Sequence, residues 1–328
     1  MSTPRRPLLA GAAAALAAPI LGLPGPVRAQ AWPNAPIRII SPFPPGGSTD
    51  ALARLLQPHL QKEFGVPVVV ENRAGASGAL GTSVVARAQP DGNAWVLVFD
   101  THAVNPALIP NLGFDTQKDL APVLLFGTAP MIVCAHGSRP WHRMQEVVAA
   151  ARAKPDTITY GSIGNGSLAH LAMELAQRAG GFKMVHVPYR GGGPIQTAAV
   201  AGEVDLAVAT PSVLIQHVEA GALRALAQTG ATRSASLPDL PTLAETGIVG
   251  VDARAFWGFL GTAGTPAPVL ARMEAALRKA LEVPEVRARF AALRIDLEPQ
   301  GQDAFRSFLD RQIGTWGRVV RENDIRAE

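Results

Sequence analysis

The sequence predicts an α/β protein built in two lobes. Short runs rich in β-branched residues alternate with segments of helical period almost throughout the chain. This alternation favours parallel sheets that are covered by helices on both faces. After a leader segment, roughly 300 of the 328 residues remain, which is more than one hydrophobic core usually serves, so we expect two lobes.

The first 31 residues have the three parts of a secretory signal peptide. Arg5-Arg6 give a positive start, an Ala- and Leu-rich run extends from Leu8 to Leu23, and small residues follow around Ala29 and Ala31. The apolar run is shorter than the ~20 residues that span a bilayer. We expect export to the periplasm by the general or the twin-arginine route, with cleavage near Ala29 or Ala31. A retained membrane anchor is the alternative.

Charge, cysteine and histidine usage exclude several classes of protein. Three of the 30 Lys and Arg residues lie in the leader, which leaves 27 against 26 Asp and Glu. No basic block remains for a run of phosphates, so nucleic acid is not expected as a partner. The single Cys134 rules out an intramolecular disulfide and a cysteine-based zinc site. The seven histidines lack metal-ligand spacing, so we expect neither a metal nor a cofactor.

Strands and helices follow in order along the chain. The helices at 50–64 and 167–180 each place leucines on one face, and the chain from Pro266 onward reads as almost wholly helical. We expect this helical tail, with segments 266–281, 284–293 and 303–322, to pack back on the first lobe. The predicted strands are 37–40, 66–70, 95–99, 123–126, 131–134, 158–160, 184–187, 206–208, 223–227 and 256–260.

Two loops rich in glycine and hydroxyl residues each connect a predicted strand to a predicted helix. We call residues 43–50 the first glycine loop and residues 161–167 the second glycine loop. The N-terminus of a helix has unpaired N–H groups and partial positive charge, so it attracts carboxylate or phosphate. Either loop alone is also explained as an ordinary turn with a Ser or Thr cap. Two such loops in two lobes favour a shared ligand site beyond the carboxyl ends of the strands.

Some residues near these loops have two possible roles. Asp50 either pairs with an amino group of a ligand or holds the N–H groups of its own loop. His170 either donates a hydrogen bond to a ligand carboxylate or faces solvent. The stretch 189–193 adds backbone donors, and Arg190 within it is either a counter-charge or a solvated cation.

Enzyme motifs are absent from the sequence. The segment Tyr160-Gly161-Ser162-Ile163-Gly164 has tyrosine where a nucleophile elbow requires its first glycine. We therefore predict that the protein is not an enzyme. A serine hydrolase that uses Ser162 or Ser167 is the rival hypothesis.

Ordered segments over nearly the whole chain after the leader resemble one family. They are residues 42–50, 70–78, 102–106, 114–123, 161–171, 187–191, 202–205, 237–242, 263–266 and 316–320. In these segments the chain resembles the Bug proteins, the extracytoplasmic binding components of tripartite tricarboxylate transporters. Asn93 and Gly261 depart from the family pattern, and neither lies in the two glycine loops.

The resemblance implies a two-lobed periplasmic-binding-protein fold of type II with two crossing strands as a hinge. Lobe I then comprises residues 32–128 and 251–328, and lobe II residues 129–250. In the family, loops that match the two glycine loops grip a ligand carboxylate, partly through bridging waters. The predicted ligand-binding residues are Phe43, Gly46, Gly47, Ser48, Thr49, Asp50, Thr101, Ser162, Gly164, Asn165, Ser167, His170, Tyr189 and Gly191.

The function that the resemblance implies is capture of a small carboxylate for transport. The ligand is expected to be a dicarboxylate, a tricarboxylate, an aromatic acid or an amino acid, and the sequence does not choose among them. We expect a monomer that presents its ligand to integral membrane permease subunits. The alternative partner is a membrane sensor kinase, for which the same protein would act as a ligand sensor.

Overall fold

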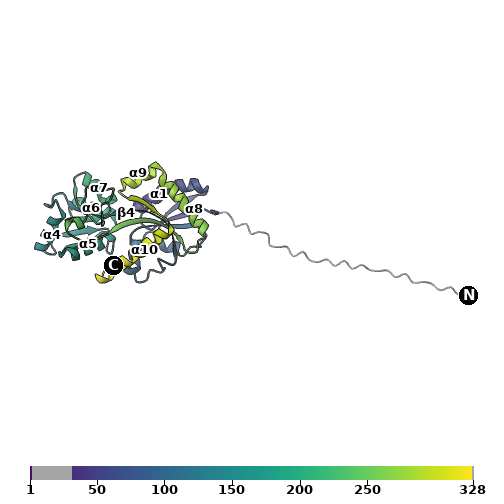
Figure 1. Cartoon of the computed structure of the whole chain (residues 1–328), viewed down its shortest axis with the longest axis horizontal. Helices are drawn as coiled ribbons and strands as arrows, with labels where there is room; N and C mark the ends of the chain where they lie inside the picture. Colours follow the sequence, from purple (N-terminus) through teal and green to yellow (C-terminus); the bar gives the residue numbers. More distant parts are fainter. Residues whose placement is uncertain (2–31, 327–328) are drawn as a thin grey trace.

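Two separate β-sheets organise the chain into two α/β lobes, which lie side by side in Figure 1. The computed structural model describes Met1 and residues 32–326. The predicted signal peptide therefore lies outside the described residues, apart from Met1. We keep the names lobe I and lobe II for the parts built on the larger and the smaller sheet.

The sheet of lobe I has six strands in the order β11-β4-β10-β3-β1-β2. Its parallel part consists of β1 (Ile37–Ser41), β2 (Val68–Asn72) and β3 (Ala94–Val98). The strand β10 (Arg254–Thr262) lies antiparallel between β3 and β4 (Leu120–Pro130). The edge strand β11 (Asp296–Gln300) pairs antiparallel with β4.

The sheet of lobe II has five strands in the order β7-β6-β8-β5-β9. Here β6 (Thr159–Ser162) pairs in parallel with both β7 (Val185–Pro188) and β8 (Leu206–Ala209). The strand β5 (Ile132–His136) is antiparallel to β8 and to β9 (Leu223–Gln228).

Helices follow the parallel strands in both lobes. The helices of lobe I that precede β4 are α1 (Ser48–Phe64), α2 (Ala79–Ala86) and α3 (Thr101–Leu108), with the short 3-10 helix η1 (Ala76–Gly78) before α2. Lobe II contains α4 (Met144–Ala153), α5 (Leu168–Gly180), α6 (Gly192–Ala201) and α7 (Pro211–Glu219), and the 3-10 helix η2 (Ala244–Thr246) follows β9. The tail forms α8 (Ala267–Glu282), α9 (Pro284–Ala292) and α10 (Gln302–Glu322). Of the described helices, none combines the length and apolar character of a membrane span.

The order of strands and helices positions the two glycine loops. In lobe I, the chain passes from β1 into α1, from β2 into η1 and α2, and from β3 into α3. In lobe II, it passes from β6 into α5, from β7 into α6 and from β8 into α7. The carboxyl ends of parallel strands meet at one sheet edge, so each lobe gathers three helix N-termini at a single edge.

The sheets and the C-terminal tail differ in part from the sequence prediction. Both sheets are mixed rather than parallel, because the strands that leave and re-enter lobe I run against their neighbours. The tail has the three expected helices, and the strand β11, which was not predicted, lies between α9 and α10. Its sequence, Asp-Leu-Glu-Pro-Gln, carries charges and a proline, which an edge strand tolerates and which hide the strand from a pattern search.

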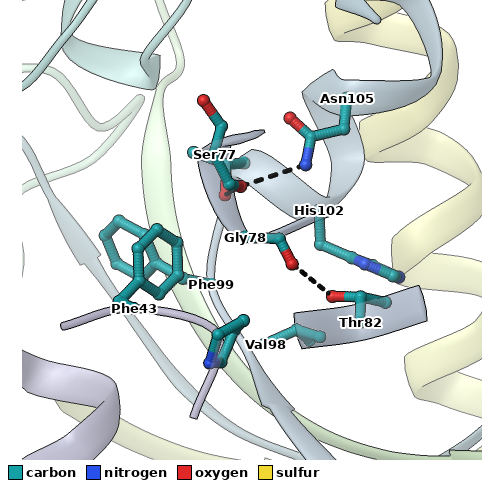
Figure 2. Close-up of a pocket in the computed structure, with 10 residues that line it drawn as sticks. Phe43, Ser77, Gly78, Thr82, Val98, Phe99, His102 and Asn105 are labelled. Carbon is teal, nitrogen blue, oxygen red and sulfur yellow. Dashed lines mark hydrogen bonds between the residues drawn. The ribbon is translucent and has the colours of Figure 1, made fainter. Parts of the chain in front are cut away.

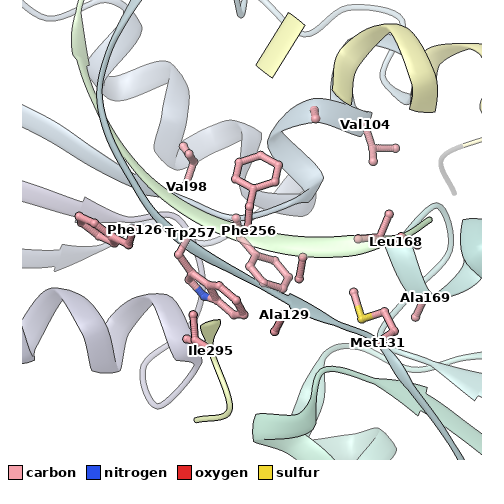
Figure 3. Packing of buried hydrophobic residues seen from close by; sticks show 14 of the residues in the cluster. Val98, Val104, Phe126, Ala129, Met131, Leu168, Ala169, Phe256, Trp257 and Ile295 are labelled. Atoms are coloured by element: carbon pink, nitrogen blue, oxygen red, sulfur yellow. The ribbon is translucent and has the colours of Figure 1, made fainter. Parts of the chain in front are cut away.

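Two chain crossings join the lobes, and both are tied at Thr229. The chain leaves lobe I from β4 through Met131 into β5, and it returns from β9 to β10 through residues 229–253. The Met131 N–H donates to Thr229 Oγ1 (3.0 Å), and this hydroxyl donates to the Ala253 carbonyl (2.5 Å). The Thr229 N–H donates to Met131 O, and the Ala253 N–H donates to Thr229 O, both at 3.0 Å. These residues are fully buried, and Figure 3 shows Met131 in a packed cluster with Ala129, Leu168 and Ala169.

The C-terminal helix α10 contacts both lobes. It packs on α3 and β4 in lobe I, as the helical tail was expected to do. It also contacts α5 in lobe II, where Arg178 forms an ion pair with Glu322 (3.4 Å). The tail therefore spans the junction between the lobes rather than covering lobe I alone.

Replacing Thr229 by valine should destabilise the protein by about 2–5 kcal/mol. The change leaves the Met131 N–H and the Ala253 carbonyl buried without partners, each of which costs about 1–3 kcal/mol. Chemical denaturation followed by circular dichroism measures the difference. The control is Thr197→Val on the exposed face of α6, which should change stability by less than about 0.5 kcal/mol. A loss below about 1 kcal/mol for Thr229→Val would contradict this account of the hinge.

Candidate functional site

The carboxylate of Asp50 holds the first glycine loop together. Its Oδ2 accepts a hydrogen bond from the Gly46 N–H (3.0 Å), and its Oδ1 accepts from Arg54 Nε and Asn72 Nδ2 (both 2.9 Å). Asn72 also donates to the Phe43 carbonyl (3.1 Å). Burial raises the pKa of Asp50, but the bonds from Gly46, Arg54 and Asn72 outweigh it, and the pKa is lowered overall. Of the two interpretations of Asp50, this geometry supports the one in which it holds the N–H groups of its own loop; direct contact with a ligand stays a prediction.

The hydroxyl groups of the first glycine loop are oriented by residues beneath it. Thr49 is buried, and its Oγ1 lies 3.2 Å from Ser41 Oγ at the end of β1. Ser48 Oγ accepts a hydrogen bond from the indole N–H of Trp257 (3.0 Å), a buried residue of β10. Because that oxygen already accepts, the Ser48 O–H is left to donate elsewhere.

The start of α1 has unused backbone donors. The residue before the helix is Gly47, which supplies no side-chain cap. Within the described part of the chain, the N–H groups of Ser48, Thr49 and Asp50 donate no hydrogen bond. Such a first turn binds an anion readily.

Ser162 holds the second glycine loop together. Its Oγ donates to Gly164 O (3.0 Å), accepts from the Gly164 N–H (3.2 Å) and from Ser167 Oγ (3.4 Å), and lies 2.7 Å from His186 Nε2. Ser162 is fully buried at the carboxyl end of β6. Its hydroxyl is therefore engaged within lobe II.

His170 is buried, and its ring stacks on the half-buried ring of His186. The Nδ1 atom of His170 accepts from the Gly166 N–H (3.1 Å), its Nε2 lies 3.6 Å from Glu174 Oε1, and its ring stacks on His186 at 3.9 Å between centroids. His170 is 8% exposed, so the interpretation of a solvent-facing histidine is wrong. Burial, together with the nearby His170, lowers the pKa of His186 to about 4, against an opposing contribution from Glu174. His186 is therefore neutral at pH 7.

The α5 helix also begins with unused donors. Ser167 is its N-cap, and the Ser167 side chain accepts from the His170 N–H (3.4 Å). Among the described residues, the N–H groups of Asn165, Leu168 and Ala169 donate no hydrogen bond. Both glycine loops thus end in a helix start whose backbone donors are not all used.

The remaining predicted residues surround the second glycine loop. The N–H groups of Tyr189 and Gly191 donate to Ser162 O (3.0 Å) and Ile163 O (3.2 Å), so this stretch is tied to the loop. Asn165 Nδ2 donates to the Arg326 carbonyl near the C-terminus (2.9 Å). Arg190 is exposed, in agreement with the solvated-cation interpretation.

The second glycine loop abuts lobe I at α3. A Cβ atom on Gly166 would lie 2.3 Å from Leu108 Cδ2, and the positive φ of Gly166 (+67°) also favours glycine. The end of α3 therefore touches the loop that starts α5. This contact brings the two lobes together beside the predicted site.

A narrow crevice lies on lobe I next to the first glycine loop (Figure 2). Its lining residues are packed so closely that the crevice has no room for a water molecule. Thr101 Oγ1 and Asn105 Nδ2 both donate to Ser77 O, at 2.9 and 3.0 Å. Of the predicted site residues, the crevice brings together Phe43 and Thr101.

Several residues that shape the loops were not predicted from the sequence. They are Ser41, Asn72, His186 and Trp257. Ser41 and Asn72 follow predicted strands directly, so the rule that sites gather at strand ends would have found them. His186 and Trp257 lie far from their partners in sequence and give no local signal.

Replacing Asp50 by asparagine should lower the free energy of unfolding by about 2 kcal/mol at neutral pH. The loop loses a buried anion that accepts from Gly46, Arg54 and Asn72, and bonds to charged groups are worth about 1.5–3 kcal/mol. Because the folded-state pKa of Asp50 is lowered, its contribution is present above the ordinary Asp pKa and is lost as the pH falls through the folded-state pKa.

Denaturant titration at pH 7 and pH 3 checks this prediction. The control is Asp303→Asn, at an exposed position in the first turn of α10, for which we expect a change of a few tenths of a kcal/mol. Equal effects of the two substitutions would mean that Asp50 does not hold the loop.

Comparisons with known proteins agree on the family of the chain. Residues 52–325 match the family model described as tripartite tricarboxylate transporter family receptor. The chain is 33% identical to protein BugT of Bordetella pertussis over 303 residues, which cover 92% of this chain and 93% of the relative.

Two solved structures with bound ligands have the same fold. The structure of Rpa4515 from R. palustris with adipate is 26% identical, has a TM-score of 0.82 and covers 90% of this chain and all of its own. MatC from Rhodopseudomonas palustris with bound malate is 29% identical, has a TM-score of 0.78 and covers 88% of this chain and all of its own.

The predicted two-lobed fold and the predicted family are thus confirmed. The family consists of receptors that bind a ligand without converting it, so the serine hydrolase hypothesis is set aside. The chain belongs to the tripartite tricarboxylate transporter receptor family and is a solute-binding protein of the Bug type.

Proposed function

We propose that the protein is an exported receptor that captures a small carboxylate between its two glycine loops. The observation that carries this proposal is the pair of helix starts with unused donors, at Ser48–Asp50 in lobe I and Leu168–Ala169 in lobe II. A carboxylate accepts several hydrogen bonds at once and is stabilised by the partial positive charge of both helix starts. Relatives of the chain bind adipate and malate, which supports a carboxylate as the ligand.

In this proposal the polar side chains hold the shape of the loops, and the backbone N–H groups contact the ligand. The side chains of Asp50, Ser162, Ser167 and Thr49 hold the loops in shape, because their oxygens are engaged within the protein. The free N–H groups contact the ligand, together with the hydroxyl of Ser48, whose O–H is left to donate. The two arginines near the described loops are not held toward the proposed ligand: Arg54 is bonded to Asp50 and Asn72, and Arg190 is exposed.

The lobes would close around the ligand by rotation at the Thr229 junction. We place lobe I at residues 32–128 and 251–328 and lobe II at residues 129–250. The closed monomer then presents the ligand to integral membrane permease subunits, as the family description implies.

Export is part of the same proposal. The charged start, the apolar run and the small-residue sites of residues 1–31 have the order of a cleavable signal. N-terminal sequencing of the periplasmic protein should begin at Gln30 or Trp32. A mature protein that still begins at Met1 would contradict cleavage.

The ligand should raise the melting temperature of the mature protein without being consumed. A panel of succinate, adipate, malate, citrate, benzoate and glutamate, read by differential scanning fluorimetry and calorimetry, should contain at least one binder. Saturation at 100 times the Kd adds about 2.7 kcal/mol to stability.

Two substitutions test whether both loops hold that binder. Ser48→Ala should weaken binding by about tenfold or more, because a hydrogen bond to a charged group is lost. Gly164→Val should abolish binding, since the side chain meets a φ of +145° and blocks the loop surface. The control is Gly250→Val, which introduces the same strain at a φ of +86° in an exposed turn outside both loops. Unchanged affinity in both Ser48→Ala and Gly164→Val would place the site elsewhere.

A further inference from the structure

Asp100 is a buried carboxyl group that the fold itself does not use. It lies between β3 and α3 and is 1% exposed. Among the described residues, no side chain donates a hydrogen bond to either of its carboxyl oxygens. An unpaired buried carboxyl group is destabilising unless a partner arrives.

The surroundings of Asp100 favour its un-ionised form. Burial raises the pKa of the Asp100 carboxyl well above its usual range, although the Thr101 backbone amide acts in the opposite direction. The side chains of Thr101 and Asn105 in α3 do not donate to the Asp100 carboxyl group, because both donate to Ser77 O. A protonated carboxyl group is a hydrogen-bond donor as well as an acceptor.

Asp100 directly follows a residue that packs against the first glycine loop. The preceding residue, Phe99, packs against Phe43 of the first loop (ring centroids 6.1 Å apart) and against Trp257 (5.1 Å), which donates to Ser48. The backbone of Asp100 is already helical (φ −52°, ψ −34°).

The helical spacing points Asp100 toward lobe II. Asp100, Val104 and Leu108 are spaced four residues apart and lie on neighbouring positions of one helix face. Leu108 contacts Gly166 of the second glycine loop. Val104 belongs to the same buried cluster as Leu168, the first residue of α5 (Figure 3). The face that carries Asp100 is thus the face of α3 turned toward lobe II.

We propose that Asp100 is a specificity-determining residue for ligands with a second carboxylate, to which its buried, unpartnered carboxyl group donates a hydrogen bond. The proposal rests on the proposed function, in which the two glycine loops hold the first carboxylate. A neutral acid attracts a second anionic group, whereas an ionised Asp100 would repel it. It also provides a donor beside the first glycine loop, where Arg54 is already bonded to Asp50 and Asn72.

Matched series of ligands test this selectivity in the mature protein. The diacids are succinate, glutarate and adipate, the mono-acids are butanoate, pentanoate and hexanoate, and the amino acids are 4-aminobutanoate, 5-aminopentanoate and 6-aminohexanoate. Isothermal titration should show that the best diacid binds at least about tenfold more tightly than the mono-acid and the amino acid of equal length.

Two variants separate the hydrogen bond from other effects. Asp100→Asn keeps a neutral donor of the same shape, so the preference for the diacid should persist within about threefold. Asp100→Leu removes the donor and should reduce diacid affinity by about tenfold or more while leaving mono-acid affinity unchanged. The control is Asp303→Leu, at an exposed position in the first turn of α10, which should change neither affinity.

The stability of the ligand-free protein gives a second readout. Because the buried carboxyl group has no partner, Asp100→Leu should raise the melting temperature of the empty protein. A purely structural role for Asp100 would lower it. Should the leucine variant not fold, Asp100→Ala gives the same affinity comparison.

The remaining outcomes contradict either the role of Asp100 or the proposed function, and the two cases can be told apart. If mono-acids bind as tightly as diacids, or if Asp100→Leu leaves the preference unchanged, the role of Asp100 is wrong while the proposed function stands. If the amino acids bind best and Asp100→Asn loses them, Asp100 acts as an anion and the proposal is likewise wrong. If none of the nine acids and none of the ligands in the wider panel binds, the proposed function itself fails.

Discussion

The architecture of the proposed site depends on backbone N–H groups at the starts of two helices in different lobes, which have no partner within the described part of the chain. At α1 these are the donors of Ser48 to Asp50, and at α5 those of Leu168 and Ala169. Buried or half-buried donors of this kind are costly unless water or a ligand satisfies them. The parallel strands bring each helix start to a sheet edge, and the side chains around each loop fix its shape. A carboxylate that meets both helix starts satisfies the donors of two lobes at once.

The polar side chains of the loops serve this backbone arrangement. In lobe I, the anion of Asp50 fixes Gly46, Arg54 and Asn72, while a buried tryptophan orients the hydroxyl of Ser48. In lobe II, Ser162 has a similar place at the end of β6, with His186 beside it. The lobes meet at Thr229, where two chain crossings share one hydroxyl group. In our proposal the lobes rotate at this junction while each loop keeps its own shape.

The sequence predicted the elements whose signals are local. Strands such as β1 and β3 and helices such as α1 and α5 appear through their apolar spacing, and both glycine loops follow from residue type. The antiparallel course of β10 and the edge strand β11 were missed, because pairing depends on segments more than 100 residues away. A related limit applies to the site. Arg54 and Glu174 are i+4 partners of Asp50 and His170 on the same helices, whereas Asn72 and His186 come from other strands and reach these residues only in the folded chain.

Hydrogen exchange with and without a bound carboxylate tests the central claim most directly. Mass spectrometry can follow the backbone amides of peptides that cover residues 43–52 and 161–170 in the same sample. If one carboxylate accepts hydrogen bonds from both helix starts, exchange should slow in both peptides together and with the same dependence on ligand concentration. Protection confined to one of the two loops, or absent from both at a saturating concentration of a proven ligand, would contradict it.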